Sequence, residues 1–219
     1  MTEAEWKVAT DPKKMLQFLL GKASDRKIRL YACACCRRIW SLLADNRSRE
    51  VIEVAEKYAD GQVNKLALVD ASRAAYRAGI TLYRRGEEVI TRWAAHAAQA
   101  SAYLNHLRLA EACLVRTMYV IEQFGIRKPA EENIEQVKLV FEVFHNPFTT
   151  GTVETTWLTS TVTAIARQMY DSRDFSAMPI LADALQDAGC DNDEILNHCR
   201  RPADHVRGCW VVDLLLNLE

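Results

Sequence analysis

The sequence predicts an all-α protein, an irregular multi-helix bundle with a smaller C-terminal helical subdomain. Glycine and proline are scarce, at eight and five among 219 residues, while alanine, leucine, glutamate and arginine are abundant. This composition favours long helices with short connections. Apolar residues also recur every three or four positions, the period of a helix with one buried face. Hydrophobic residues make up 49% of the chain, enough for a substantial core.

Residues typical of helix ends mark the first three predicted helices. The Asp-Pro pair at 11–12 combines an N-cap with a proline in the first helical position, and Gly21 ends that short helix. Ser24 caps a second helix, in which Ile28 and Cys35 belong to one apolar stripe. A third helix is expected from Arg47 to Asp60, with a glycine directly after it.

The middle of the chain is the longest helical tract. Residues 63–101 contain no proline, but a break is expected near Arg85–Gly86 because glycine weakens a helix. Another helix fits Tyr103 to Phe124. The next one begins at Pro129 and reaches the Asn146–Pro147 pair.

Residues 148–157, FTTGTVETTW, form the expected domain boundary, since clustered threonines around a glycine disfavour helix. The sequence thus predicts a main helical bundle at 1–148 and a subdomain at 149–219 that packs on it. Four shorter helices are expected in the second part, at about 156–171, 177–188, 192–199 and 205–217.

Charge and composition exclude several classes of protein. With 28 basic and 29 acidic residues, the net charge of -1 gives no long-range attraction to nucleic acid or to an anionic membrane. We interpret the basic groups as solvated helix edges; they are Arg26-Lys27 with Arg29, Arg37-Arg38, Arg84-Arg85 and Arg200-Arg201. The polar N-terminus lacks the features of a secretory signal, so a cytoplasmic protein with reduced cysteines is expected.

Five cysteines and histidines gather between positions 190 and 209. The metal hypothesis assigns zinc to Cys190, Cys199, His205 and Cys209, with His205 and Cys209 one helical turn apart. His198 is left out because adjacent helical residues point about 100° apart, so His198 and Cys199 rarely both ligate. The favoured interpretation is packing: Cys190 follows a helix cap, Cys209 is a small apolar residue, and the histidines are partly exposed. No cofactor is therefore expected unless these residues bind zinc.

Two other sequence patterns allow both a functional and a structural interpretation. Cys33, Cys35 and Cys36 lack the C-x-x-C spacing of redox pairs, and we interpret them as core residues, although a mixed site with Cys209 stays open. Glu142 and His145 form one E-x-x-H spacing, which di-iron bundles use twice. Because it occurs once, at a helix end, His145 is interpreted as a helix C-terminal residue.

Common catalytic motifs are absent from the sequence: it has no phosphate loop, G-x-S-x-G elbow, H-E-x-x-H pair or kinase signature. We therefore expect a non-catalytic protein–protein interaction or regulatory module with an unidentified protein partner. The alternative is a metal-binding or thiol redox-sensing protein that uses the C-terminal cluster. An enzyme would need His145 or His205 beside a carboxylate.

Two stretches carry a resemblance: ASDRKIRLYACACCRRIW near the start, and ILADALQDAGCDNDEILNHCRRPADHVRGCWVVDLLL at the end. With HNPF and Trp157 between them, they resemble an uncharacterised paralogous family of short helical proteins of planctomycete bacteria. The resemblance implies a bacterial cytoplasmic origin. It implies no activity, cofactor or catalytic residue.

Overall fold

The computed structural model describes residues 1–103, 106–149 and 151–218, leaving aside the side chains of residues 90, 93 and 106–108. Within these ranges the chain is all helical and contains no strand, which confirms the predicted fold class. None of the helices found there combines the length and the apolar character needed to cross a bilayer.

The chain divides into two compact units, Met1–Phe141 and Glu142–Glu219. The division lies within the last turn of a helix, before the predicted boundary at 148. Residues 151–154, Gly-Thr-Val-Glu, are indeed without helix, but the turn that carries Glu142 already belongs with the second unit.

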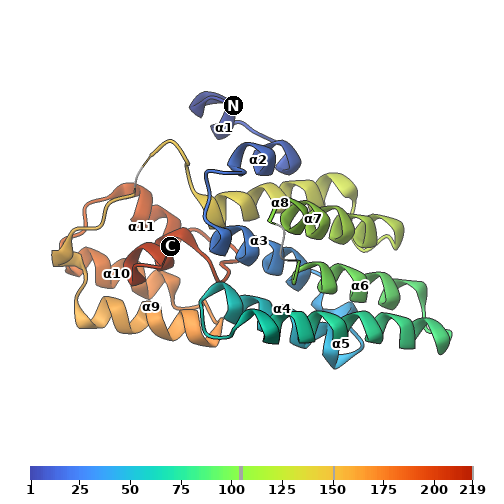
Figure 1. Cartoon of the computed structure of the whole chain (residues 1–219). Coiled ribbons are helices and arrows are strands. Elements are labelled where there is room, and N and C mark those ends of the chain that lie inside the picture. The colour runs from blue at the N-terminus through green and yellow to red at the C-terminus, as the bar shows by residue number, and fades with distance from the viewer. Residues whose placement is uncertain (104–105, 150, 219) are drawn as a thin grey trace. The chain divides into compact units, whose positions relative to one another are not determined.

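The first unit contains eight α-helices among its described residues (Figure 1): α1 Glu3–Lys7, α2 Pro12–Leu19, α3 Asp25–Arg37, α4 Asn46–Ala59, α5 Lys65–Arg84, α6 Val89–Ala100, α7 His106–Gln123 and α8 Pro129–Phe144, whose last turn crosses into the second unit. The predicted caps are present, since the side chains of Asp11 and Ser24 accept backbone N–H groups of their helices. The break at Gly86 is also present, with φ of 69°. Helix α1 is not among the predicted elements; a Thr2–Glu5 capping box begins it.

Helix α3 is central to the first unit. It packs on α4 and α7, and α5 packs on both α4 and α6. Ten of its residues are buried, including all three of its cysteines. Cys33 bonds the carbonyl of Ile52, Cys35 bonds Gln136 and Cys36 bonds the carbonyl of Ala97. The three thiols therefore point to different neighbours and, as predicted, serve the core.

The interpretation as solvated helix edges was wrong for four arginines: Arg26, Arg29 and Arg37 of α3, and Arg38, which follows it. Arg29 is 2% exposed and donates to the carbonyls of Ser101 and Tyr103. Arg26 pairs with Asp60 at 2.8 Å, and Arg37 pairs with Glu56. Composition does not reveal this, because the acidic partners lie 19 or more positions away in sequence.

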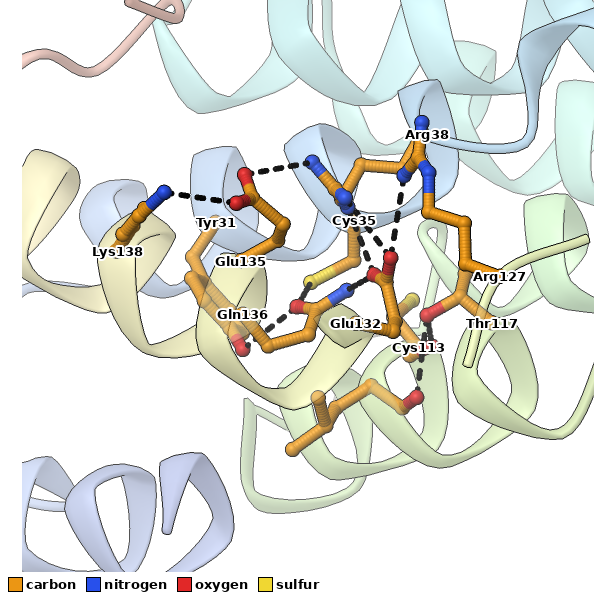
Figure 2. Close-up of polar contacts among 11 residues, drawn as sticks. Tyr31, Cys35, Arg38, Cys113, Thr117, Arg127, Glu132, Glu135, Gln136 and Lys138 are labelled. Carbon is orange, nitrogen blue, oxygen red and sulfur yellow. Dashed lines mark hydrogen bonds and ion pairs between the residues drawn. The ribbon is translucent and has the colours of Figure 1, made fainter. Parts of the chain in front are cut away.

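Arg38 belongs to a buried polar network between α3 and α8 (Figure 2). Its guanidinium donates to both oxygens of Glu132 at 2.7 and 2.8 Å, and Gln136 also donates to Glu132. Gln136 in turn accepts from Tyr31 and Cys35. Each group is satisfied by another, which fixes the register of the two helices.

The second unit contains four α-helices within the described part: α9 Ser160–Ser172, α10 Met178–Asp187, α11 Asp193–Arg200 and α12 Trp210–Leu216, with a 3-10 turn at Thr155–Trp157. Helix α10 packs on α9 and α11, and α12 packs on α9 and α11. Their apolar faces form one core that includes Trp157, Tyr170 and Leu185.

The last helix begins at Trp210 and not at 205 as predicted. Residues 202–206 have no regular structure, because Pro202 cannot continue α11 and Gly208 adopts φ of 97°. His205 and Cys209 therefore do not share a helical face. Both belong to the connection between α11 and α12.

A candidate metal centre

Four side chains of the second unit converge on one position. Glu142 comes from the last turn of α8, His198 from α11, and His205 and Cys209 from the connection before α12. Each offers one ligand atom, and these atoms all lie within 4.8 Å of one another. We call these four residues the EHHC group.

The contacts within the EHHC group are short. His205 Nδ1 lies 2.9 Å from Glu142 Oε1, and His198 Nε2 lies 3.5 Å from Glu142 Oε2. His198 Nε2 is also 3.1 Å from Cys209 Sγ. The carboxylate thus faces both imidazoles, and one imidazole faces the thiol.

The EHHC group is removed from solvent. The side chains of Glu142 and His205 are each 3% exposed and that of His198 is 6% exposed, while Cys209 is fully buried. Buried polar atoms of this kind are stable only when other polar groups or a metal satisfy them. Among the described residues, His205 Nε2 is buried without a hydrogen-bond partner.

Helix α11 presents His198 because of its amphipathic pattern. Asn192 caps the helix, and Ile195, Leu196, His198 and Cys199 face inward while Arg200 is exposed. His198 and Cys199 are adjacent, so their side chains leave the helix in different directions. His198 reaches Glu142, and Cys199 packs into the apolar core.

Two aromatic contacts hold His198 in its orientation. Trp210 donates its indole Nε1–H to His198 Nδ1 at 2.9 Å. His145, which follows α8 with φ of 52°, stacks on Trp210 with ring centroids 3.8 Å apart and planes 19° from parallel. The stack fixes the indole, and the indole fixes the imidazole.

Arg201 is the neighbouring cation. Its Nη2 donates to Glu142 Oε2 at 2.6 Å, and its side chain is 40% exposed. Burial opposes ionisation of Glu142, but hydrogen bonds from His198 and His205 outweigh burial and hold the Glu142 pKa well below its usual range. Glu142 is therefore an anion at neutral pH.

His198 and Cys209 stay neutral in the metal-free site. Burial lowers the pKa of His198, against the opposing effect of Glu142. Burial, and then the nearby Glu142 carboxylate, raise the pKa of Cys209 well above that of an ordinary thiol. A cation at this position would reverse the second effect, because it favours the thiolate.

Of the four residues assigned to zinc from the sequence, the structure brings His205 and Cys209 into the EHHC group. Cys190 and Cys199 lie outside this group, buried in the apolar core of the same unit at 3% and 0% exposure. Cys36 belongs to the first unit and Cys209 to the second.

Sequence reasoning omitted His198 and Glu142 from the ligand set. Of the adjacent pair, the structure places His198, and not Cys199, beside Glu142 and Cys209. Glu142 had a signal of its own in the E-x-x-H spacing, yet its partners are His198 and His205, not His145. His145 instead contacts Trp210 and lies 3.4 Å from Glu194.

Comparison with known proteins assigns this chain to no family. No family model matches this chain, and no curated protein and no solved structure is significantly similar to it. The proposed function therefore depends on the chemistry of the EHHC group.

Proposed function

We propose that residues 142–219 form a metal-binding module and that its ion is zinc, bound in the EHHC group. The observation that supports this proposal is the convergence of four ligand atoms, within 4.8 Å of one another, in a buried position. Thiolate sulfur, imidazole nitrogen and carboxylate oxygen are the ligand types that zinc uses in proteins. A divalent ion of the magnesium class would need oxygen ligands instead.

The distances between the ligand atoms suit an ion after side-chain adjustment. Tetrahedral zinc with bonds of about 2.0–2.3 Å separates its ligand atoms by about 3.3–3.7 Å. In the EHHC group, the His205–Glu142, His198–Cys209 and His198–Glu142 pairs of ligand atoms are 2.9, 3.1 and 3.5 Å apart. The closest pairs must move apart by a few tenths of an ångström and pairs as far apart as 4.8 Å must draw together, so binding needs side-chain adjustments in both directions.

The charges also suit a dication. Glu142 and the thiolate of Cys209 together neutralise zinc, so the buried site carries no net charge once Cys209 has lost its proton. Arg201 is 40% exposed, so solvent can hydrate its guanidinium.

The thiol-sensing alternative has less support. A redox sensor needs an accessible cysteine with a low pKa. Burial raises the pKa of Cys199 to about 12, and Cys209 is fully buried. We further propose a bacterial cytoplasmic location, since a reducing compartment keeps Cys209 available as a ligand.

Metal analysis of the full chain tests the proposal. The protein is purified without a histidine tag or chelator, loaded with zinc, desalted and measured for bound metal. We expect about one zinc per chain. The Cys209→Ser variant should bind zinc with an affinity lower by roughly tenfold or more. Cys199→Ser is the matched control, since Cys199 is a buried neighbour outside the EHHC group. Wild-type protein without zinc, or equal losses in both variants, would refute the proposal.

A second candidate function is the protein–protein interaction expected from the sequence, and one feature of the first unit favours it. A groove of about 450 Å³ lies between α5 and α6, lined by Tyr76, Gly79, Ile80, Tyr83, Arg92 and His96. Tyr76 and Tyr83 are 50% and 70% exposed, and Arg92 lies over the ring of Tyr83. Exposed aromatic rings beside a cation suit a partner segment that places a carboxylate next to apolar side chains.

Peptides of matched sequence test this second candidate. A fluorescent amphipathic peptide with acidic residues is compared with its lysine counterpart. We expect the acidic peptide alone to bind, and we expect Arg92→Glu to abolish its binding. If neither peptide binds, or if both bind equally to the variant, the groove has no such function.

A further inference from the structure

Trp210 determines which nitrogen of His198 carries the proton. The indole Nε1 lies 2.9 Å from His198 Nδ1, and both residues are buried. An indole N–H can only donate, so His198 Nδ1 accepts. A neutral imidazole has one proton, which must then be on Nε2, the nitrogen that faces Cys209 and Glu142.

This tautomer is the opposite of the one that a metal-bound histidine adopts. A ligating nitrogen needs a free lone pair, and the other ring N–H usually donates to a carboxylate or a carbonyl. In His198 the nitrogen nearest the other ligands carries the proton, and the second nitrogen meets a donor. Turning the ring over would place a carbon against the Trp210 N–H and lose that hydrogen bond.

Trp210 is itself held in place. Its ring stacks on His145 at 3.8 Å, and the residue is 8% exposed at the start of α12. Moving the indole away from His198 would break this stack and disturb the core around α12. The hydrogen bond to His198 is therefore a fixed property of the site.

We infer that three of the four converging side chains, Glu142, His205 and Cys209, ligate the ion, that His198 does not, and that a fourth coordination position beside the Nε2–H of His198 is left for water or a small anion. This inference rests on the zinc site proposed above. Three protein ligands and an open position characterise reactive zinc sites, whereas structural sites have four protein ligands. The EHHC side chains are at most 6% exposed, so a ligand at this position must consist of only a few atoms.

His198 then has a defined role next to the ion. Its Nε2–H is a hydrogen-bond donor aimed at the group, 3.1 Å from Cys209 Sγ. A donor in that place stabilises negative charge, either on the thiolate or on a bound anion such as hydroxide. His198 is a positioning residue that favours an anionic fourth ligand.

Cobalt substitution of the full chain tests this assignment, with azide as the probe. The visible bands of cobalt(II) report its coordination, and a near-ultraviolet thiolate-to-cobalt band reports Cys209. We expect azide to change the visible bands of the wild-type protein in a saturable manner. His198→Gln should keep the thiolate-to-cobalt band, because Glu142, His205 and Cys209 hold the ion, but it should bind azide more weakly, because the amide N–H does not reproduce the position of the imidazole Nε2–H.

Trp210→Phe provides the sharper variant. Phenylalanine keeps an aromatic ring against His145 but removes the N–H, so the His198 proton can move to Nδ1 and Nε2 can ligate. We expect this variant to bind cobalt and to lose azide affinity by roughly tenfold or more. Trp157→Phe is the matched control, because Trp157 is 5% exposed in the same core and is outside the EHHC group.

The outcomes separate the two proposals. If wild-type cobalt protein ignores azide, or if His198→Gln loses cobalt together with the thiolate band, His198 is the fourth ligand and the inference is wrong. An equal azide response in Trp210→Phe and Trp157→Phe would also overturn it. If wild-type protein binds neither cobalt nor zinc, the metal site itself is refuted.

Discussion

Replacing Glu142 by glutamine tests how far the second unit depends on this carboxylate. Glu142 is 3% exposed and accepts from Arg201 at 2.6 Å and from His205 at 2.9 Å. Glutamine preserves the size but turns an NH₂ group toward one of these donors. Hydrogen bonds to charged groups contribute about 1.5–3 kcal/mol, and the half-exposed Arg201 can recover water. We expect metal-free Glu142→Gln to lose about 2–3 kcal/mol of unfolding free energy at pH 7.

The assay is the urea dependence of Cys199 alkylation, followed by mass spectrometry. Cys199 is fully buried in the core of the second unit, so its reaction reports unfolding of that unit alone. Glu194→Gln is the control, because Glu194 is 60% exposed and 3.4 Å from His145. It should cost less than about 1 kcal/mol. Equal losses in the two variants would refute the argument from burial.

The pH dependence follows from the low pKa of Glu142. A group with a lowered folded-state pKa stabilises the protein fully above its unfolded pKa, about 4.3 for glutamate, and this stabilisation is lost as pH falls further. The difference between wild type and Glu142→Gln should therefore persist from pH 7 to 5.5 and shrink below pH 4.3. With zinc bound the difference should grow, since the variant then also loses a ligand; an unchanged difference would remove Glu142 from the ligand set.

Three further predictions concern the same molecule. Zinc affinity, measured by competition with a chromogenic chelator, should fall about tenfold per pH unit below pH 8 because the Cys209 thiol must release a proton; a flat profile would exclude thiolate ligation. All seven cysteines are buried and free, so a thiol reagent should label none of them rapidly in native protein and all in urea. In the first unit, Glu132→Gln should cost about 3 kcal/mol in urea unfolding followed by circular dichroism, because it leaves Arg38 and Arg127 facing a neutral group. Glu135→Gln should cost less than about 1 kcal/mol, since Glu135 is 31% exposed and 3.8 Å from Arg38; comparable losses would contradict the assignment of the network.

Most helix boundaries could be predicted because local signals determine them. Asp11, Ser24 and Asn192 accept backbone N–H groups at helix starts, and Gly61 and Gly125 follow helix ends with positive φ. Such caps act within a few residues, so they can be recognised without any tertiary information. The pairing of Arg29, Arg37 and Arg38 could not be predicted in this way, because their partners come from α4, α8 and the residues after α6.

The EHHC group was only half predictable, for two different reasons. The density of cysteine and histidine identified the right segment and led to His205 and Cys209. The choice between His198 and Cys199 depends on which side of α11 faces Glu142. The apolar pattern of the helix does not determine this, because both residues are buried. Glu142 lies 56 positions before His198, and no local spacing connects a carboxylate to ligands so far along the chain.

The connection between α11 and α12 explains why a metal would matter for the fold. His205 and Cys209 lie in a stretch without helix, where Pro202 and Gly208 prevent the helical hydrogen bonds that order other segments. The contacts from His205 and Arg201 to Glu142 tie this stretch to α8, and the contact from Cys209 to His198 ties it to α11. An ion bound to Glu142, His205 and Cys209 would strengthen the same links with shorter and stronger bonds. Metal binding should therefore order the 201–209 connection more than any helix, so its amide hydrogen exchange should slow most when zinc is added.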